Sequence, residues 1–333
     1  MTRRLITCAV AIGLTIVAGC GSQPGVTAAP PTTQPKPVGL LVLAQFDRGV
    51  GAVHTGSADP VWNDPDAVAA LDGSAVFSVS RAGTELVRLD PNTGATTSAW
   101  GLPEATLSIS AVAPGGRWGA LTDRPIGYGA QPPRPTTQLV VFDAVSGAET
   151  RRLALTGDLR PEAFAVDGKL VFALDYRGDH YRVQTVDLAS GEQWDTGTRD
   201  KTIEREDMHG TSVRGVLNAD HTLLATLYRD PTNAEAPAFV HVLDLRNGWA
   251  YCADLPTPFG TGPEGSDHIE LTAAGTVIVT TAASPRIAEI HIAEVHQPVS
   301  KPVTVEYRDA SGPPDNSASV SAPGFGHVIA TLG

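Results

Sequence analysis

One string that recurs along the chain constrains the fold more than any other feature. In each copy, an alternating apolar and polar run ends in Asp, and a small or polar turn then closes on Gly. The four copies are LVRLDPNTG, LVVFDAVSG, VQTVDLASG and VHVLDLRNG. The Asp side chain can accept hydrogen bonds from its own turn, and Gly can adopt the positive φ that the turn needs. Each copy therefore predicts a β-strand, a tight turn and a returning strand.

The copies recur at a nearly regular interval. Their turn aspartates are Asp90, Asp143, Asp187 and Asp244, at spacings of 53, 44 and 57 residues, and a degenerate copy places His291 at the same position 47 residues later. A pair of short alternating runs precedes each string, and a fourth run follows it. Units of about 50 residues with four strands each indicate a β-propeller, in which each unit is one blade.

The two ends of the chain supply the parts of one more blade. Five complete units extend over residues 64–308, residues 38–56 form a strand pair without a beginning, and residues 318–333 form a first pair without a continuation. Joining the ends would close the ring and remove the exposed edges of an open array. We therefore predict an all-β domain over residues 38–333 with six four-stranded blades. Seven blades remain an alternative, which would require a blade that the pattern does not show.

The repeated units resemble the YVTN and WD40-like repeats of bacterial surface propellers. The resemblance extends over nearly the whole chain after residue 38, and the WD dipeptide itself is absent. It implies the architecture and leaves the function open, because propellers serve many unrelated functions.

The N-terminal segment indicates export and lipidation. Arg3 and Arg4 precede an apolar stretch of 15 residues, 5–19, which is short for a transmembrane helix and typical of a signal peptide. The segment ends in VAGC, which resembles the lipobox of bacterial lipoproteins. We expect residues 1–19 to be a signal peptide and Cys20 to be the lipidation site, with acyl chains such as palmitate anchoring the protein to the cell membrane from the extracytoplasmic side. An ordinary signal peptide that contains Cys20 by chance is the alternative.

The residues after the lipobox predict a tether and a domain without disulfides. Residues 21–37 are rich in Pro, Thr and Ala and lack large apolar residues, so residues 20–37 are interpreted as the lipidated Cys and a semi-extended linker. Cys8 would leave with the signal peptide, so Cys252 would be the only thiol of the propeller. Because it lies in an alternating apolar run, we expect a buried, unreactive thiol.

Charge and composition exclude some partners. The 333 residues carry a formal charge of −12, which argues against nucleic acid as a ligand and against a basic membrane-binding patch. The scarcity of Lys and the abundance of Arg, Ala, Gly and Pro are typical of a GC-rich, actinobacterial-type genome. We expect a monomer whose contact with the membrane is the lipid anchor, and whose partner, if it has one, is another envelope protein.

Motifs for common enzyme classes are weak or missing. There is no G-x-S-x-G, and the G-x-G-x-x-G match at 260–265 is interrupted by Pro263 and precedes a strand where a phosphate-binding helix would be needed. His291 and His296 are five residues apart, so on one strand they would point to opposite faces and could not bind one metal ion together. The chain is therefore interpreted as a binding protein more readily than as an enzyme.

Propeller geometry gives a rule for choosing candidate site residues. The innermost strand of each blade lines the central channel, and counting back from the first turn glycine of each blade gives the positions at the channel mouth. The ionisable candidates found in this way are Asp66, Glu162, Arg214 and His268. Asp66, Glu162 and His268 would together suit a cation or a basic or polyhydroxylated ligand, which Arg214 could oppose. The alternative is an ordinary solvated channel entrance.

Further candidates lie in loops and on outer strands. Asp207 and His209 belong to the charged loop IEREDMHG, and Tyr128 belongs to a Pro-rich insertion at 124–138; both loops could contact a partner. Three tryptophans that fall on or near fourth strands are predicted to pack between adjacent blades, namely Trp100, Trp194 and Trp249.

These observations favour a lipid-anchored extracytoplasmic propeller that acts as a ligand- or protein-binding or scaffold module of the cell envelope. No organic cofactor is indicated. The alternative is a metal-dependent hydrolase or lactonase with its site at the channel mouth, in which a divalent cation would be held by Asp66, Glu162 and His268. A third hypothesis is an envelope assembly factor whose loops dock another protein.

Overall fold

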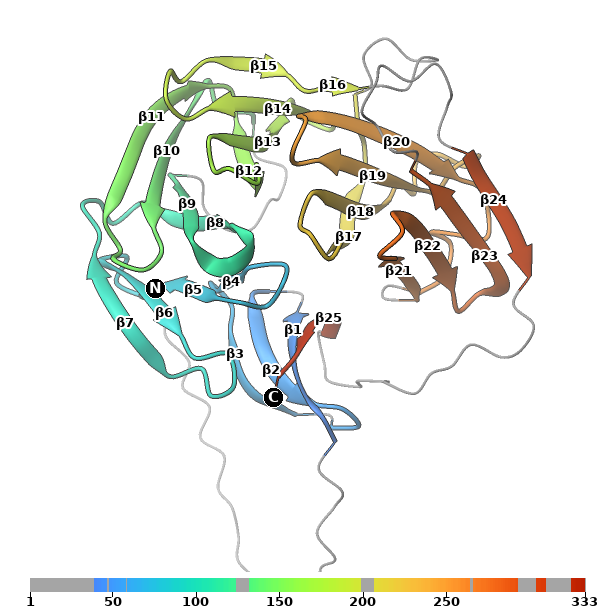
Figure 1. Ribbon diagram of the computed structural model, residues 1–333, viewed down its shortest axis with the longest axis horizontal. Helices are drawn as coiled ribbons and strands as arrows, with labels where there is room; N and C mark the ends of the chain where they lie inside the picture. Colours follow the sequence, from blue (N-terminus) through green and yellow to red (C-terminus); the bar gives the residue numbers. More distant parts are fainter. Residues whose placement is uncertain are drawn as a thin grey trace, which may run out of the picture. The chain divides into compact units, whose positions relative to one another are not determined.

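Six β-sheets stand around a common centre in the computed structural model of this protein (Figure 1). The structure describes residues 39–46, 48–57, 59–123, 132–198, 207–263, 266–292, 304–309 and 325–332. Within these ranges the only helical turn is a short 3-10 segment, Pro114–Gly116, and no helix is long and apolar enough to cross a bilayer. The predicted all-β fold with six propeller blades is confirmed.

Blades 1 to 3 follow one another along the chain. Blade 1 contains β4 (Val68–Ala69), β5 (Val76–Val79), β6 (Glu85–Leu89) and β7 (Thr96–Gly101). Blade 2 contains β8 (Ser108–Val112), β9 (Trp118–Thr122), β10 (Thr136–Asp143) and β11 (Glu149–Thr156). Blade 3 contains β12 (Leu159–Phe164), β13 (Leu170–Tyr176), β14 (Tyr181–Asp187) and β15 (Gln193–Asp195).

Blades 4 to 6 complete the ring. Blade 4 contains β17 (Thr211–Leu217), β18 (Leu223–Arg229), β19 (Ala238–Asp244) and β20 (Trp249–Leu255), and β16 (Gly197–Thr198) adds a fifth strand parallel to β20. Blade 5 contains β21 (Asp267–Leu271), β22 (Thr276–Thr281), β23 (Ser284–His291) and β24 (Thr304–Asp309). Blade 6 contains β25 (Phe325–Thr331), β1 (Leu41–Phe46), β2 (Val50–His54) and β3 (Pro60–Asp64).

Blade 6 joins the two ends of the chain, as the sequence predicted. β25 pairs antiparallel with β1, with Val42 opposite Thr331 and Leu43 opposite Ala330 (Figure 1). The expected division of two strands from each end is wrong within the described residues, because the N-terminal side contributes β1, β2 and β3 and the C-terminal side contributes β25. The reason is that residues 60–64 pair with β2 as a third consecutive strand.

The turn aspartates act as their residue type predicts. Oδ1 of Asp143 accepts hydrogen bonds from the backbone nitrogens of Val145 and Ser146, at 3.1 and 2.8 Å, and Gly147 closes the turn with a φ of +70°. The same arrangement recurs at the other three aspartates of the repeat. A short acceptor beside exposed amide groups therefore fixes the end of the third strand in four blades.

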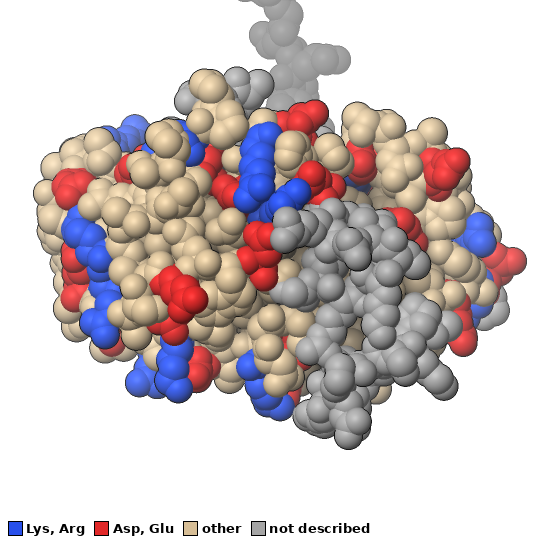
Figure 2. Space-filling view, turned by 90° about the horizontal axis from the view of Figure 1, so that it is seen from above, with Lys and Arg blue, Asp and Glu red and all other residues tan. Residues whose placement is uncertain are grey.

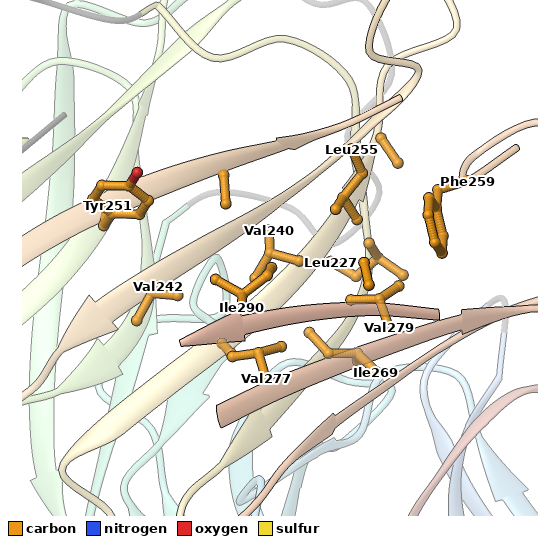
Figure 3. Close-up of a cluster of buried hydrophobic side chains, with 14 of the residues drawn as sticks. Leu227, Val240, Val242, Tyr251, Leu255, Phe259, Ile269, Val277, Val279 and Ile290 are labelled. Atoms are coloured by element: carbon orange, nitrogen blue, oxygen red, sulfur yellow. The ribbon is translucent and has the colours of Figure 1, made fainter. Parts of the chain in front are cut away.

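Apolar side chains fill the space between neighbouring blades. Figure 3 shows the cluster between blades 4 and 5, where Val240 and Leu255 meet Ile269, Val279 and Ile290. Corresponding clusters join blade 1 to blade 2, blade 2 to blade 3, blade 3 to blade 4 and blade 6 to blade 1. Each fully buried aliphatic side chain contributes about 1.5–3 kcal/mol to the free energy of folding. These interfaces therefore hold the inner strands at fixed positions around the centre.

Tryptophans on the outer strands pack mostly as the sequence predicted. The Trp100 indole on β7 lies against Gly147 in the turn of the next blade, and Trp249 is buried in the cluster between blades 4 and 5. Trp62 on β3 likewise lies against Gly94 of blade 1. The prediction is wrong for Trp194, which is 40% exposed on the short strand β15.

Candidate functional site

The inner strands enclose a central cavity of 560 Å³. This volume lies within the range of small-molecule sites, which is about 300–1,000 Å³. The cavity is lined from β4, β8, β12 and β17, from β18 behind β17, and from β1 and β25 of the closing blade. Its polar lining residues are Gln45, Ser110, Arg160, Glu162, Thr211, Ser212, Arg214, Thr226, Tyr228 and Arg229.

Glu162 on β12 is one of the polar groups at this cavity. Its Oε1 accepts a hydrogen bond from the Tyr228 hydroxyl at 3.2 Å, which connects blade 3 to blade 4. Its Oε2 is buried and has no hydrogen-bond partner among the described residues. Burial raises the pKa of the Glu162 carboxyl, and the nearby Arg160 guanidinium opposes this effect. A carboxyl in such surroundings binds a proton more readily than one in water.

Tyr228 is held rigidly in place behind Glu162. Its ring stacks on Phe239 at a centroid distance of 5.0 Å and an interplanar angle of 3°, and it also packs against Tyr181 and His241. Burial raises the pKa of the Tyr228 hydroxyl well above its usual value, so the hydroxyl remains a hydrogen-bond donor. The aromatic cluster thus orients the donor that fixes one carboxyl oxygen of Glu162.

Arg214 on β17 supplies a positive charge to the same cavity. A register shift between Ser212 and Arg214 marks a β-bulge in the β17–β18 pair, and such bulges change the direction of nearby side chains. Nε of Arg214 is buried without a hydrogen-bond partner among the described residues. Burial lowers the pKa of the guanidinium, and Glu270 on β21 opposes the shift. Arginine nevertheless stays protonated in proteins, so this site keeps its positive charge.

Two other arginines contact the cavity with different surroundings. Arg160 lies two residues before Glu162 on β12, and its charge acts on that carboxyl. Arg229 is bound to blade 5, because its Nε donates to the Gly260 carbonyl at 3.1 Å and lies 3.5 Å from a carboxylate oxygen of Asp267. Arg229 therefore holds blades 4 and 5 together, whereas Nε of Arg214 has no hydrogen-bond partner among the described residues.

The four predicted channel-mouth residues separate into two groups. Glu162 and Arg214 line the central cavity, whereas Asp66 and His268 are not part of its lining. Asp66 lies in a turn before β4, where its backbone nitrogen donates to Asp64 at 2.9 Å. His268 lies on the more exposed face of β21, where partial burial lowers its pKa and Arg214 adds to that effect.

The predicted loop residues are partly described. Asp207 pairs with Arg182 of β14 and lies 3.8 Å from Nε2 of His180, and Arg182 holds the pKa of Asp207 below its usual value. The ring of His209 lies 5.9 Å from that of His180. These contacts attach the end of the loop to blade 3. Tyr128 and Cys20 lie outside the described residues.

Sequence reasoning missed Arg160 and Tyr228 as parts of the cavity. The spacing of Arg160 and Glu162 carries a usable signal, because strand residues two apart share a face. Tyr228 lies on a second strand, β18, and reaches the cavity where it pairs with Ser212 of β17. No local pattern indicates that contact, since it depends on the orientation of one blade against the next.

No cluster of three or more His, Cys, Asp or Glu side chains that could hold a metal ion occurs within the described ranges. Cys252 is buried on β20 and takes part in no disulfide there, and its sulfur lies 3.7 Å from that of Met208. The buried thiol agrees with the environment expected from its alternating run.

Comparisons with known proteins find likenesses of fold. No protein-family model matches the chain, and no curated protein matches it. TolB from Acinetobacter baumannii is similar in structure, with 15% identity and a TM-score of 0.40 over 75% of this chain and 60% of the TolB chain. The Cps50 (Swd1) beta-propeller domain of Myceliophteria thermophila has 12% identity and a TM-score of 0.42, over 72% of this chain and 69% of that domain. This chain thus spans about 60% of the length of TolB.

Proposed function

We propose that this protein is a lipid-anchored, extracytoplasmic propeller that binds a small molecule in its central cavity. The observation that carries the proposal is a cavity of 560 Å³ lined by Glu162 and Arg214, whose Oε2 and Nε atoms are buried and have no hydrogen-bond partner among the described residues. Leaving a buried polar group unpaired costs about 1–3 kcal/mol, and more for a charged group. A ligand that pairs with both atoms would recover that free energy.

Binding explains this arrangement better than metal-dependent hydrolysis does. The hydrolase alternative depends on Asp66, Glu162 and His268 meeting at one point, and only Glu162 lines the cavity. Its carboxyl faces arginines there, and Arg160 is the charge that acts on it most strongly. We therefore propose a binding module, and propose that any envelope partner contacts the outer surface of the propeller.

The membrane attachment in this proposal depends on the sequence VAGC, which ends at Cys20. We expect Cys20→Ala to abolish lipid modification and to leave the protein either unprocessed or released from the membrane. Fractionation of cells that express each form, with mass spectrometry of the N-terminal peptide, measures both effects. A mature variant that remains in the membrane would contradict the anchor.

The ligand-binding proposal can be tested before the ligand is known. We expect native mass spectrometry of the purified full-length protein to show a small molecule that co-purifies with it. Ser212→Trp should remove that molecule, because Ser212 is exposed and lines the cavity, so an indole at this position would occupy part of the cavity volume. Ser190→Trp, in an exposed turn of blade 3, is the control and should retain it. Equal occupancy in both variants would exclude the central cavity as the site.

A further inference from the structure

We infer that the ligand of the central cavity is a small oxyanion-bearing molecule, a carboxylate or a phosphate, which is anchored by Arg214 and contacted by Glu162. This inference rests on the proposed function, because it names the chemical class of the ligand for the same site. Its support comes from three features of the cavity: an unpaired arginine nitrogen, the environment of the Glu162 carboxyl and the balance of charge.

The first feature is the unpaired Nε of Arg214. The Nε–H lies on one edge of the guanidinium plane, beside one of the terminal nitrogens. Two parallel N–H donors on that edge match the two oxygens of a carboxylate or a phosphate group. Nε is buried and has no acceptor among the described residues, so a ligand oxygen that reached this edge would supply the acceptor that it lacks. A cation could not bind there.

The second feature is the position and environment of Glu162. Tyr228, which donates to Glu162, pairs with Ser212, and Arg214 follows two residues later on the same strand. Glu162 and Arg214 therefore line the same cavity from adjacent blades, and Tyr228 connects Glu162 to the strand pair that carries Arg214. The titratable groups around Glu162 are Arg160, Tyr181 and Tyr228, and burial has the largest effect on its carboxyl, raising its pKa. In its protonated form, the carboxyl can donate the proton on Oε2 to a ligand oxygen.

The third feature is the charge of the cavity within an acidic protein. Three arginines, Arg160, Arg214 and Arg229, line it with one carboxyl, Glu162. Arg229 is paired with Asp267, and Glu270 near Arg214 lies outside the lining. The chain as a whole carries a formal charge of −12. Acidic and basic side chains alternate on the outer side shown in Figure 2, with no extended patch of one sign. The lining thus holds more basic than acidic side chains, unlike the side of the molecule seen in Figure 2, and this balance favours an anion.

The sequence predicts that Asp66, Glu162 and His268 together suit a cation or a basic or polyhydroxylated ligand. The cavity instead combines Glu162 with arginines, which favours an anionic ligand. A ligand carrying one oxyanion group would accept a hydrogen bond from Nε of Arg214. Its other oxygens could accept a hydrogen bond from the protonated carboxyl of Glu162. Both unpaired atoms then receive partners from one molecule.

The test measures binding of defined probes to the detergent-purified full-length protein at constant ionic strength. Sodium succinate and sodium phosphate are the anionic probes, and putrescine and glucose are the cationic and neutral probes. We expect saturable calorimetric binding of an anion, and the comparison of succinate with phosphate decides between carboxylate and phosphate. Arg214→Met should weaken it about tenfold to a hundredfold, the loss expected for one charge-assisted contact. Arg246→Met is the control, since it removes the same charge from an exposed turn.

A pH series separates the role of Glu162 from simple charge attraction. Because a protonated carboxyl donates, anion binding should tighten as the pH falls through the raised pKa of Glu162. Glu162→Gln keeps a donor at this position, so it should bind the anion and lose this pH dependence. Binding of putrescine or glucose that Ser212→Trp blocks would overturn the anion inference and leave the binding function intact. Failure of all probes, together with no co-purified molecule, would overturn both.

Discussion

The carboxamide of Gln193 forms two hydrogen bonds with the backbone of Thr156. The Thr156 nitrogen donates to Oε1 of Gln193 at 2.8 Å, and Nε2 of Gln193 donates to the Thr156 carbonyl at 2.9 Å. Thr156 ends β11 of blade 2, and Gln193 begins β15 of blade 3. The side chain therefore pairs with the edge of the neighbouring blade in the way that another strand would, and it links the outer strands of blades 2 and 3.

The first prediction concerns this link. Gln193→Ala removes both hydrogen bonds and also the one that Nε2 of Gln193 donates to Oε1 of Gln184 at 3.2 Å, so we expect the free energy of unfolding to fall by about 1–2 kcal/mol. Gln193→Glu should cost at least as much, because it replaces the donor to the Thr156 carbonyl with a carboxylate oxygen. Urea unfolding monitored by circular dichroism measures both. Glu192→Ala is an adjacent exposed control; an equal loss in that variant would show that the effect does not come from the link to Thr156.

Much of the fold could be predicted because its signals are local. The repeated aspartates determine turns through bonds to their own backbone, as Asp143 does with Ser146, and this chemistry is visible in nine residues of sequence. The closing blade could also be predicted, since unmatched strands at the two ends must pair or remain as open edges. The added strand β16 has no such signal, because its two residues pair with β20 only after the blades have assembled.

The candidate site could be predicted only in part, for a geometric reason. Glu162 and Arg214 lie on strands with residues facing the channel, so counting from the turns located them. The same count included Asp66, which precedes the two-residue strand β4 and is held in a turn. The two residues of β4 line the cavity, but the strand begins only at Val68, and the sequence pattern does not show where it begins. The role of Tyr228 depends on packing between blades.

The second prediction separates packing at a turn from backbone strain. Gly147 has a φ of +70°, and a Cβ at this position would overlap the Trp100 indole of blade 1. Gly56 has a φ of +77° with nothing within 4 Å of such a Cβ. We expect Gly56→Ala to cost about 1–2 kcal/mol from strain alone, and Gly147→Ala to cost about 1–3 kcal/mol more from overpacking. Chemical denaturation measures the difference; equal losses would show that Trp100 moves away freely.

The third prediction tests ring closure by a cross-link. Val42 and Thr331 are directly opposite in the β1–β25 pair, so their Cα atoms are about 4.5–5.5 Å apart, which a disulfide can span. We expect Val42→Cys with Thr331→Cys to form a disulfide on oxidation and to raise the melting temperature until a reductant is added. Val53→Cys with Thr331→Cys is the control, because Val53 pairs with Val42 from the far side and lies about 10 Å from Thr331. Cross-linking in the control alone would contradict the strand order of blade 6.

The last prediction concerns the acid stability that His241 determines. His241 is 1% exposed on β19, and burial lowers its pKa from 6.5 to about 4. The unfolded chain therefore takes up a proton between these values and the folded protein does not, so stability falls as the pH drops from about 6.5 to about 4. The loss should reach about 3 kcal/mol, from a difference of 1.36 kcal/mol for each pKa unit. In His241→Phe, which keeps a ring beside Tyr228, this part of the pH dependence should disappear from urea unfolding curves, whereas the exposed control His291→Phe should retain it. An unchanged pH profile in His241→Phe would assign the acid sensitivity to other groups.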